Sequence, residues 1–152
     1  MRIALYEPDI PQNAGAILRL ASCFSISVDI IEPCGFVFSN RRLKRSGMDY
    51  IDNVELKLHV SWNRFYREQQ ADISARIILL TTKGSISHTK FQFKSNDVLL
   101  LGRESAGVPE AVHAAADARI IVPIAPETRS LNITSSAAIV LGEALRQTNA
   151  YP

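Results

Sequence analysis

The sequence predicts an α/β protein in which helices cover both faces of a mostly parallel sheet. Short apolar stretches typical of strands alternate along the chain with stretches whose apolar residues recur at helical spacing. Two of the strand-like stretches, Ile77–Thr82 and Val98–Leu101, are almost entirely apolar. Such runs are typical of strands that are buried on both faces of a parallel sheet.

The first half of the chain is predicted to hold three strands and three helices. The strand Arg2–Tyr6 ends where Pro8 and Pro11 force an extended loop, and Asn13 suits the N-cap of the helix that follows. Ile17, Leu18, Ala21 and Phe24 form the apolar face of that helix. The same patterns predict a strand at Val28–Ile31, a short basic helix at residues 40–46, a strand at Val54–Val60 and a helix at Trp62–Gln70.

The second half adds strands at Ile77–Thr82, Val98–Leu101 and Ile120–Val122. A helix is predicted at Pro109–Ala116, and a long last helix carries an apolar stripe formed by Ile133, Ala137, Val140, Leu141, Ala144 and Leu145. Ligands of open α/β sheets bind beyond the carboxyl ends of the strands. We therefore expect the functional site at the loops that follow Leu80, Leu101 and Val122.

Length and composition favour a single domain over residues 1–152. A chain of 152 residues, 47% of them apolar, is long enough to bury one core. Cys23 and Cys34 lack the spacing of a disulfide framework, so we expect both thiols to be reduced and buried. The first seven residues, Met1–Glu7, are too short and too soon acidic for a signal peptide, so we expect none. No apolar run approaches the ~18 residues of a membrane span. We expect a cytoplasmic protein with no membrane partner.

Several common sites are excluded. The first strand is followed by no dinucleotide-binding glycine motif, and neither a P-loop nor a zinc-protease motif occurs. His59, His88 and His113 are isolated in sequence, which favours surface or internally satisfied histidines over metal ligands or bases. We expect no metal.

Charge is weak evidence for a nucleic-acid partner, because the net charge is only +2. A local cluster is more informative, since Arg41, Arg42, Lys44 and Arg45 lie within five consecutive residues. This cluster is either a solvated helix face or a patch that contacts phosphates.

Each candidate site residue has two interpretations. Gly102 and Gly107 bracket either a tight turn or a loop whose backbone lies against a ligand. Glu104 between them is either a solvated carboxylate or one that orients loop amides or pairs with Arg19 across the site. Ser130 and Asn132 either cap the last helix or present its positive end to an anion. Arg19 is either an exposed cation or a group that clamps a phosphate and stabilises a developing alkoxide.

In order and separation, these motifs resemble the SPOUT class of RNA methyltransferases, and most closely its TrmL (YibK-like) family of short tRNA 2′-O-methyltransferases. The resemblance covers essentially the whole chain. It is carried by Glu7-Pro8, Pro11-x-Asn13-x-Gly15 with Arg19, Ile31-Glu32-Pro33-x-Gly35-Phe36, Asp49-Tyr50, Thr81-Thr82-Lys83-Gly84, Gly102-x-Glu104-x-x-Gly107-x-Pro109 and Arg129-Ser130-x-Asn132.

The resemblance implies a C-terminal trefoil knot and S-adenosylmethionine-dependent methylation of the ribose of tRNA nucleotide 34, with S-adenosylhomocysteine as product. It implies that Leu80, Gly102, Val122, Ser130 and Leu131 bind the cofactor. It further implies that Arg19 activates the ribose hydroxyl, with Asn13, Glu104 and Asn132 around it.

The resemblance also implies partners. Family members form homodimers through the first and last helices. A chain this short would bind the tRNA anticodon loop as a dimer, with its basic cluster as part of the binding surface. Many relatives carry an aromatic residue where this chain has Gly142, which weakens inferences about dimerisation and RNA contact at that position. The alternatives are a SPOUT ribose methyltransferase that acts elsewhere on tRNA or on rRNA, or a knot domain that binds RNA without turnover.

Overall fold

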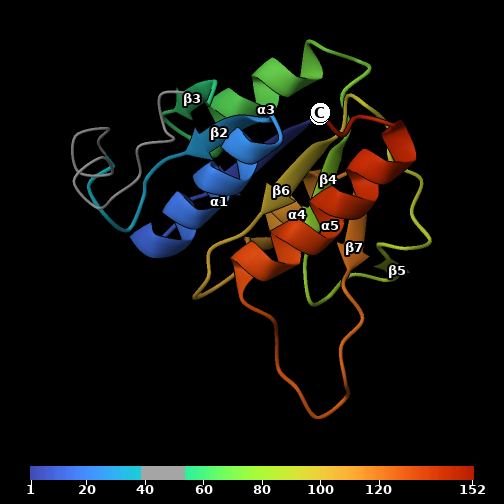
Figure 1. The fold of residues 1–152 in the computed structure, drawn as a ribbon. Coiled ribbons are helices and arrows are strands. Elements are labelled where there is room, and N and C mark those ends of the chain that lie inside the picture. Colours follow the sequence, from blue (N-terminus) through green and yellow to red (C-terminus); the bar gives the residue numbers. More distant parts are fainter. Residues whose placement is uncertain (39–53) are drawn as a thin grey trace.

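Seven parallel strands form the centre of the computed structural model, which describes residues 1–38 and 54–152 (Figure 1). The strand order across the sheet is β3-β2-β1-β6-β4-β7-β5, and every pairing is parallel. The predicted α/β class with a mostly parallel sheet is confirmed. The strands are β1 (Arg2–Tyr6), β2 (Ser27–Ile31), β3 (Leu56–His59), β4 (Ile77–Leu80), β5 (Ile86–Ser87), β6 (Val98–Leu101) and β7 (Ala118–Ile121).

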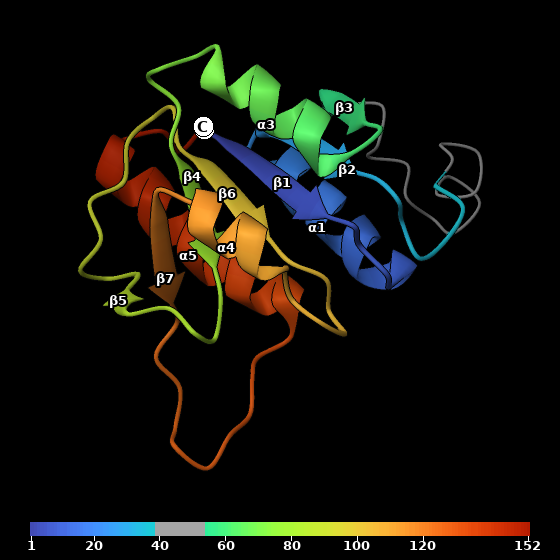
Figure 2. The ribbon, with the colours of Figure 1, turned by 180° about the vertical axis from the view of Figure 1, so that it is seen from behind.

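Helices cover both faces of this sheet (Figures 1 and 2). On one face lie α1 (Pro11–Cys23) and α5 (Ile133–Thr148), packed against each other and against inward side chains such as Ile3 and Leu5 of β1. On the other face lie α3 (Trp62–Gln70) and α4 (Glu110–Ala115), which pack with Ala4 and Tyr6. The alternation of side chains along β1 therefore divides the core into two layers.

The element boundaries agree with the sequence-based prediction in most places. Helix α3 and strand β6 have the predicted bounds. The strands predicted at Val54–Val60 and Ile77–Thr82 are shorter, and the one predicted at Ile120–Val122 begins earlier, at Ala118. The two-residue strand β5 was not predicted. The basic helix predicted at residues 40–46, with Arg41, Arg42, Lys44 and Arg45, lies outside the described residues.

The predicted N-cap of α1 is wrong. The helix begins at Pro11 and its N-cap is Ile10, whose side chain makes no capping hydrogen bond. Proline has no N–H to satisfy and its fixed φ suits the first helical position, so the helix starts two residues before Asn13. The side chain of Asn13 is therefore available for contacts across the molecule.

One predicted burial is also wrong, because Cys23 is exposed at the end of α1, whereas Cys34 is half-buried. Burial raises the pKa of the Cys34 thiol to about 11, so this thiol is protonated at neutral pH. His59 is buried and its Nε2 lies 2.7 Å from Oδ1 of Asp29, which agrees with the interpretation of an internally satisfied histidine.

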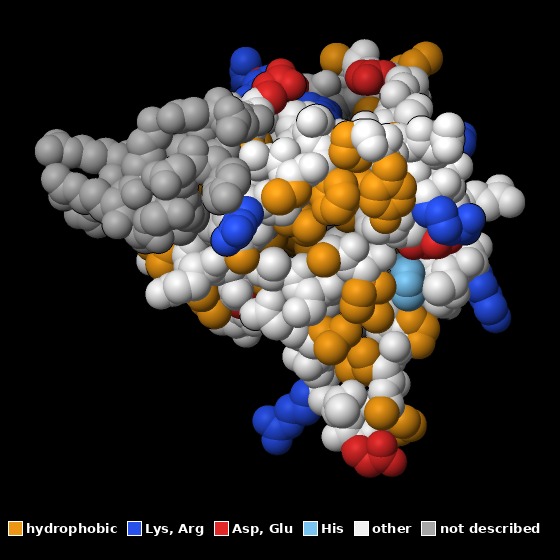
Figure 3. Space-filling view, in the orientation of Figure 1, with side chains coloured by type: hydrophobic (Ala, Val, Ile, Leu, Met, Phe, Trp, Pro, Cys, Tyr) orange, Lys and Arg blue, Asp and Glu red, His pale blue; other side chains and the backbone are white. Residues whose placement is uncertain are grey.

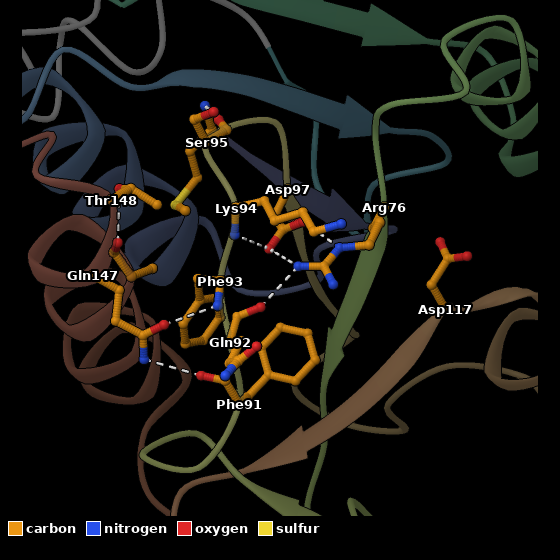
Figure 4. Close-up of polar contacts among 12 residues, drawn as sticks. Arg76, Phe91, Gln92, Phe93, Lys94, Ser95, Asp97, Asp117, Gln147 and Thr148 are labelled. Atoms are coloured by element: carbon orange, nitrogen blue, oxygen red, sulfur yellow. Dashed lines mark hydrogen bonds and ion pairs between the residues drawn. The ribbon is translucent and has the colours of Figure 1, made fainter.

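Polar side chains fix the segment that precedes β6 (Figure 4). Arg76 donates two hydrogen bonds to the buried carboxylate of Asp97, of 2.8 Å from Nε and 2.7 Å from a terminal nitrogen. The side chain of Gln147 in α5 donates to the carbonyl of Phe91 and accepts from the amide of Phe93, both at 2.9 Å. These contacts hold α5 at the amino end of β6, opposite to the loops that form the site.

Within residues 1–38 and 54–152, no helix has the length and apolarity needed to cross a membrane.

Candidate active site

A cavity of about 730 Å³ lies beyond the carboxyl ends of β4, β6 and β7. Its walls come from segments 79–82, 101–108 and 121–133, with Ile10 and Asn13 at the start of α1 and Ser136 in α5. Neighbouring parallel strands end at the same edge, and the crossover connections bring their loops together there. The cavity therefore lies where the sequence predicted a site, and its volume is typical of small-molecule pockets.

The structure brings most of the predicted site residues together in this cavity. The lining includes residues from all three loops and from the start of α1, namely Asn13, Leu80, Gly102, Glu104, Val122, Ser130, Leu131 and Asn132. Arg19 is exposed on the outer face of α1 and is not among the described residues that line the cavity.

A chain of hydrogen bonds joins three distant segments at the cavity wall. Asn13 Nδ2 donates to Glu104 Oε1 at 3.1 Å, and Asn132 Nδ2 donates to Asn13 Oδ1, also at 3.1 Å. Oδ1 of Asn132 accepts from the amides of Thr134 and Ser135, so the same side chain caps α5. Asn132 is the cap of this helix, as one of its two interpretations required. Its amide nitrogen also joins the chain of hydrogen bonds at the cavity wall, while an anion at the start of α5 stays a prediction.

The carboxyl group of Glu104 is further tied to Asp9. The Asp9 amide donates to Glu104 Oε2 at 3.1 Å, and the Glu104 amide donates to Asp9 Oδ1 at 3.2 Å. Hydrogen bonding with Glu104 and Ser105 lowers the pKa of Asp9 to about 2. Burial, and then the contact with Asp9, raise the pKa of Glu104 above its ordinary value. Asp9 is therefore the firmly ionised member of the pair, and Glu104 is the member that takes up a proton more readily.

The glycines of the loop after β6 are required by its geometry. A Cβ at Gly102 would lie 2.8 Å from the carbonyl carbon of Gly107, and Gly107 itself has φ of +68°. Arg103 and Gly107 exchange two backbone hydrogen bonds, of 2.9 and 2.8 Å. The resulting tight turn confirms the structural interpretation of these glycines and presents the backbone of Gly102 to the cavity, while its contact with a ligand stays a prediction.

Sequence reasoning missed Asp9, Arg103 and Ile10. Arg103 forms ion pairs with Glu7 at 3.3 Å and with Asp9 at 3.7 Å, while Ile10 lines the cavity and is 41% exposed. The available signal for Asp9 was an acidic residue directly after the Glu7-Pro8 turn.

The cavity can hold a small molecule but gives no sign of a metal centre. Among the residues that the structure describes, no three His, Cys, Asp or Glu side chains lie close enough to hold a metal ion. Apolar side chains such as Leu80 and Val122 line the cavity together with the first turn of α5. This combination suits a ligand with an aromatic end and an anionic end, since helix N-termini favour negative charge.

The fold and the site define the class of protein. The model of the SpoU rRNA Methylase family matches residues 1–142, and the chain belongs to this family. The resemblance to SPOUT RNA methyltransferases predicted from the motifs is thereby confirmed.

Individual relatives are more specific. The chain is 55% identical over 148 residues to a tRNA (cytidine(34)-2'-O)-methyltransferase of Beijerinckia indica subsp. indica, covering 97% of this chain and 92% of that protein. A solved structure that gives insights into the 2-OH methylation of C/U34 on tRNA is 37% identical, with a TM-score of 0.87, and covers 96% of this chain and 94% of that one. An AdoMet-bound rRNA methyltransferase from Sinorhizobium meliloti is 27% identical, with a TM-score of 0.85, over 95% of this chain and 55% of its own.

Proposed function

We propose that this protein transfers the methyl group of S-adenosylmethionine to the ribose 2′-hydroxyl of nucleotide 34 of a tRNA. The observation that carries the proposal is the cavity itself, in which Asn13, Glu104 and Asn132 from three distant segments meet beside a glycine turn. The full-length likeness to tRNA (cytidine(34)-2'-O)-methyltransferases supports the choice of substrate.

The residues of the cavity fit the donor. The backbone at Leu80, Gly102 and Val122 would hold the adenine, and Ser130 and Leu131 would close the site. The first turn of α5, capped by Asn132, would face the donor's carboxylate. When bound, the donor supplies an electrophilic methyl group, and the protein's contribution is to align the ribose oxygen with it.

Arg19 is the proposed group that activates the hydroxyl. A guanidinium stays protonated, so it can orient the ribose and stabilise a developing alkoxide but cannot serve as a base. Arg19 is exposed on α1, which is one of the two helices that a second subunit would cover in the proposed dimer.

A homodimer through α1 and α5 is part of the proposal. The outer faces of these helices carry small and apolar residues, including Ala16, Ala138 and the 41% exposed Ile139. Figure 3 shows apolar side chains gathered on this side of the molecule. Tyr151 folds back over Gly142, donating to its carbonyl at 3.0 Å, and packs its ring against Phe24. An aromatic ring thus covers α5 at Gly142.

The tRNA would be held by this dimer. Arg41, Arg42, Lys44 and Arg45, which lie outside the described residues, are proposed to contact phosphates, and the anticodon loop offers unstacked, accessible nucleotides. We further infer that residues 1–152 form one domain, that its C-terminal segment is threaded into a trefoil knot, and that the protein works in the cytoplasm.

Mapping of the methylated nucleotide tests the proposal. Unmodified tRNA and, in a separate reaction, rRNA fragments would be incubated with the purified protein and S-adenosylmethionine, digested with nuclease and analysed by mass spectrometry. We expect one 2′-O-methylated nucleotide, at position 34. Methylation of rRNA fragments or of another tRNA position would replace the proposed substrate, and donor binding without any transfer would rule out the activity.

A further inference from the structure

Asp9, which belongs to none of the site motifs, contacts the loop that follows β6. Its amide and its Oδ1 form reciprocal hydrogen bonds with the side chain and the amide of Glu104. Its second carboxylate oxygen accepts from the hydroxyl of Ser105 and lies 3.7 Å from Nε of Arg103. One side chain therefore contacts three consecutive residues of the loop after β6.

The same residue lies directly before the start of α1. Asp9 directly precedes Ile10, whose carbonyl accepts the first hydrogen bonds of α1, from the amides of Asn13 and Ala14 at 3.1 and 3.2 Å. Movement of Asp9 would thus shift both Glu104 and the helical turn that carries Asn13. These two residues form the hydrogen bond at the cavity wall.

A third segment is shaped to leave room for Asp9. A Cβ at Gly35 would lie 2.8 Å from Cβ and 2.9 Å from Cα of Asp9, and the Gly35 amide donates to the carbonyl of Pro8 at 2.9 Å. Asp9 is therefore packed between the Gly35 turn and the loop of residues 103–105, which leaves its backbone little freedom to move.

The contact is separate from the part of the loop that would hold the donor. The turn around Gly102 is closed by the backbone bridge between Arg103 and Gly107, which does not involve Asp9. Loss of the Asp9 carboxylate would leave that turn in shape but would free the Glu104 side chain and, with it, Asn13.

We propose that Asp9 is a positioning residue for methyl transfer, which aligns Glu104 and Asn13 against the ribose without touching donor or substrate. This inference rests on the proposed function. Asp9 is thereby assigned a role in the alignment of the ribose hydroxyl rather than in donor binding. A variant without the Asp9 carboxylate should therefore lose more kcat than affinity for S-adenosylmethionine.

The test compares Asp9→Ala, Asp9→Glu and Gly35→Ala with Asp72→Ala as the matched control. Asp72 also accepts from a serine hydroxyl, at 2.6 Å, and from a backbone amide, at 3.0 Å, but in an exposed turn that is remote from the cavity. Since a misplacement of about 1 Å can reduce a rate on the order of 10²-fold, we expect Asp9→Ala to lower kcat about 10- to 100-fold. The dissociation constant for S-adenosylmethionine should rise less than about threefold.

The other variants separate positioning from folding. Asp9→Glu keeps the carboxylate and should recover part of the rate. Gly35→Ala keeps Asp9 but displaces it, and should reproduce part of the loss. Asp72→Ala should leave kcat unchanged. The proposal is overturned if kcat in Asp9→Ala falls less than about threefold, or if the affinity for S-adenosylmethionine falls as much as kcat does. It is also overturned if kcat of Asp9→Glu is no higher than kcat of Asp9→Ala.

A measurement without turnover keeps this inference apart from the proposed function. Hydrogen exchange of the Glu104 amide and of segment 11–15 should accelerate in Asp9→Ala, while the bridged amides of Arg103 and Gly107 stay protected. Asp72→Ala should change none of these rates. Unchanged exchange in Asp9→Ala would overturn the coupling even in an active enzyme. A wild-type protein that methylates no tRNA would instead refute the proposed function, whatever the exchange result.

Discussion

The side-chain amide of Asn132 donates a 3.1 Å hydrogen bond to Oδ1 of Asn13, although the two residues are 119 positions apart. Asn132 is at the same time the N-cap of α5 through its own Oδ1. The two halves of one amide group thus serve two purposes, since the oxygen stabilises the helix and the nitrogen joins it to the start of α1.

The substitution Asn132→Asp separates these purposes. Aspartate caps helices about as well as asparagine, so the free energy of unfolding should change by less than about 0.5 kcal/mol. An aspartate cannot donate to Asn13, and we expect kcat for methyl transfer to fall at least about tenfold. Denaturant titration and steady-state kinetics measure the two effects. Equal kcat in variant and wild type would show that the link to Asn13 has no part in the reaction.

The turn after β6 allows a test of donor binding. In Gly102→Ala the new Cβ would lie within 3 Å of the Gly107 backbone, so the turn must open and the affinity for S-adenosylmethionine should fall at least about tenfold. Gly142→Ala is the control, because its Cβ would meet only the movable hydroxyl of Tyr151, at 3.2 Å. Calorimetric titration measures the affinity of both variants for S-adenosylmethionine. Wild-type affinity in Gly102→Ala would contradict the proposal that the donor lies against this turn.

Gln147 should stabilise the fold without a role in the reaction. Its replacement by alanine leaves the amide of the buried Phe93 and the carbonyl of Phe91 without their side-chain partner (Figure 4). We expect the free energy of unfolding to drop by about 1–3 kcal/mol. Chemical denaturation measures this drop, while kcat of the folded variant should equal that of the wild type. A variant as stable as the wild type would show that α5 is not held by these bonds.

The pH dependence of transfer should report on Glu104. Its pKa is raised above the ordinary 4.5, chiefly by burial and then by the contact with Asp9. Since protonation weakens Glu104 as an acceptor for Asn13, kcat/KM should fall as the pH is lowered, starting above the range of an ordinary glutamate. In Glu104→Gln this acid limb should disappear, because the amide does not titrate. Persistence of the same limb in that variant would assign it to another group.

The sequence predicted those features that depend on local patterns. The apolar run Val98–Leu101 and the helix Trp62–Gln70 have the expected bounds because their patterns are clear and their flanks are marked. The start of α1 differs from the prediction because the fit of Pro11 to the first helical position outweighs the cap preference of Asn13. Strand β5 is two residues long, too short for any periodicity to reveal.

The site could be predicted only as a set of loops. The motif residues gave the resemblance, and the rule for parallel sheets indicated which edge they would occupy. The contacts among Asn13, Glu104 and Asn132 depend on the strand order, in which β6 lies beside β1 and β7 lies beyond β4. Asp9 belonged to no motif, and only its packing against Gly35 and Ser105 reveals its place.

The most direct test is a crystal structure of the protein with S-adenosylhomocysteine. The account predicts the product in the cavity of about 730 Å³, with its adenine against the backbone of Leu80, Gly102 and Val122 and its carboxylate toward the first turn of α5. Product bound elsewhere, or a cavity still empty at a saturating concentration, would contradict the claim that these three loops form the methyl-donor site.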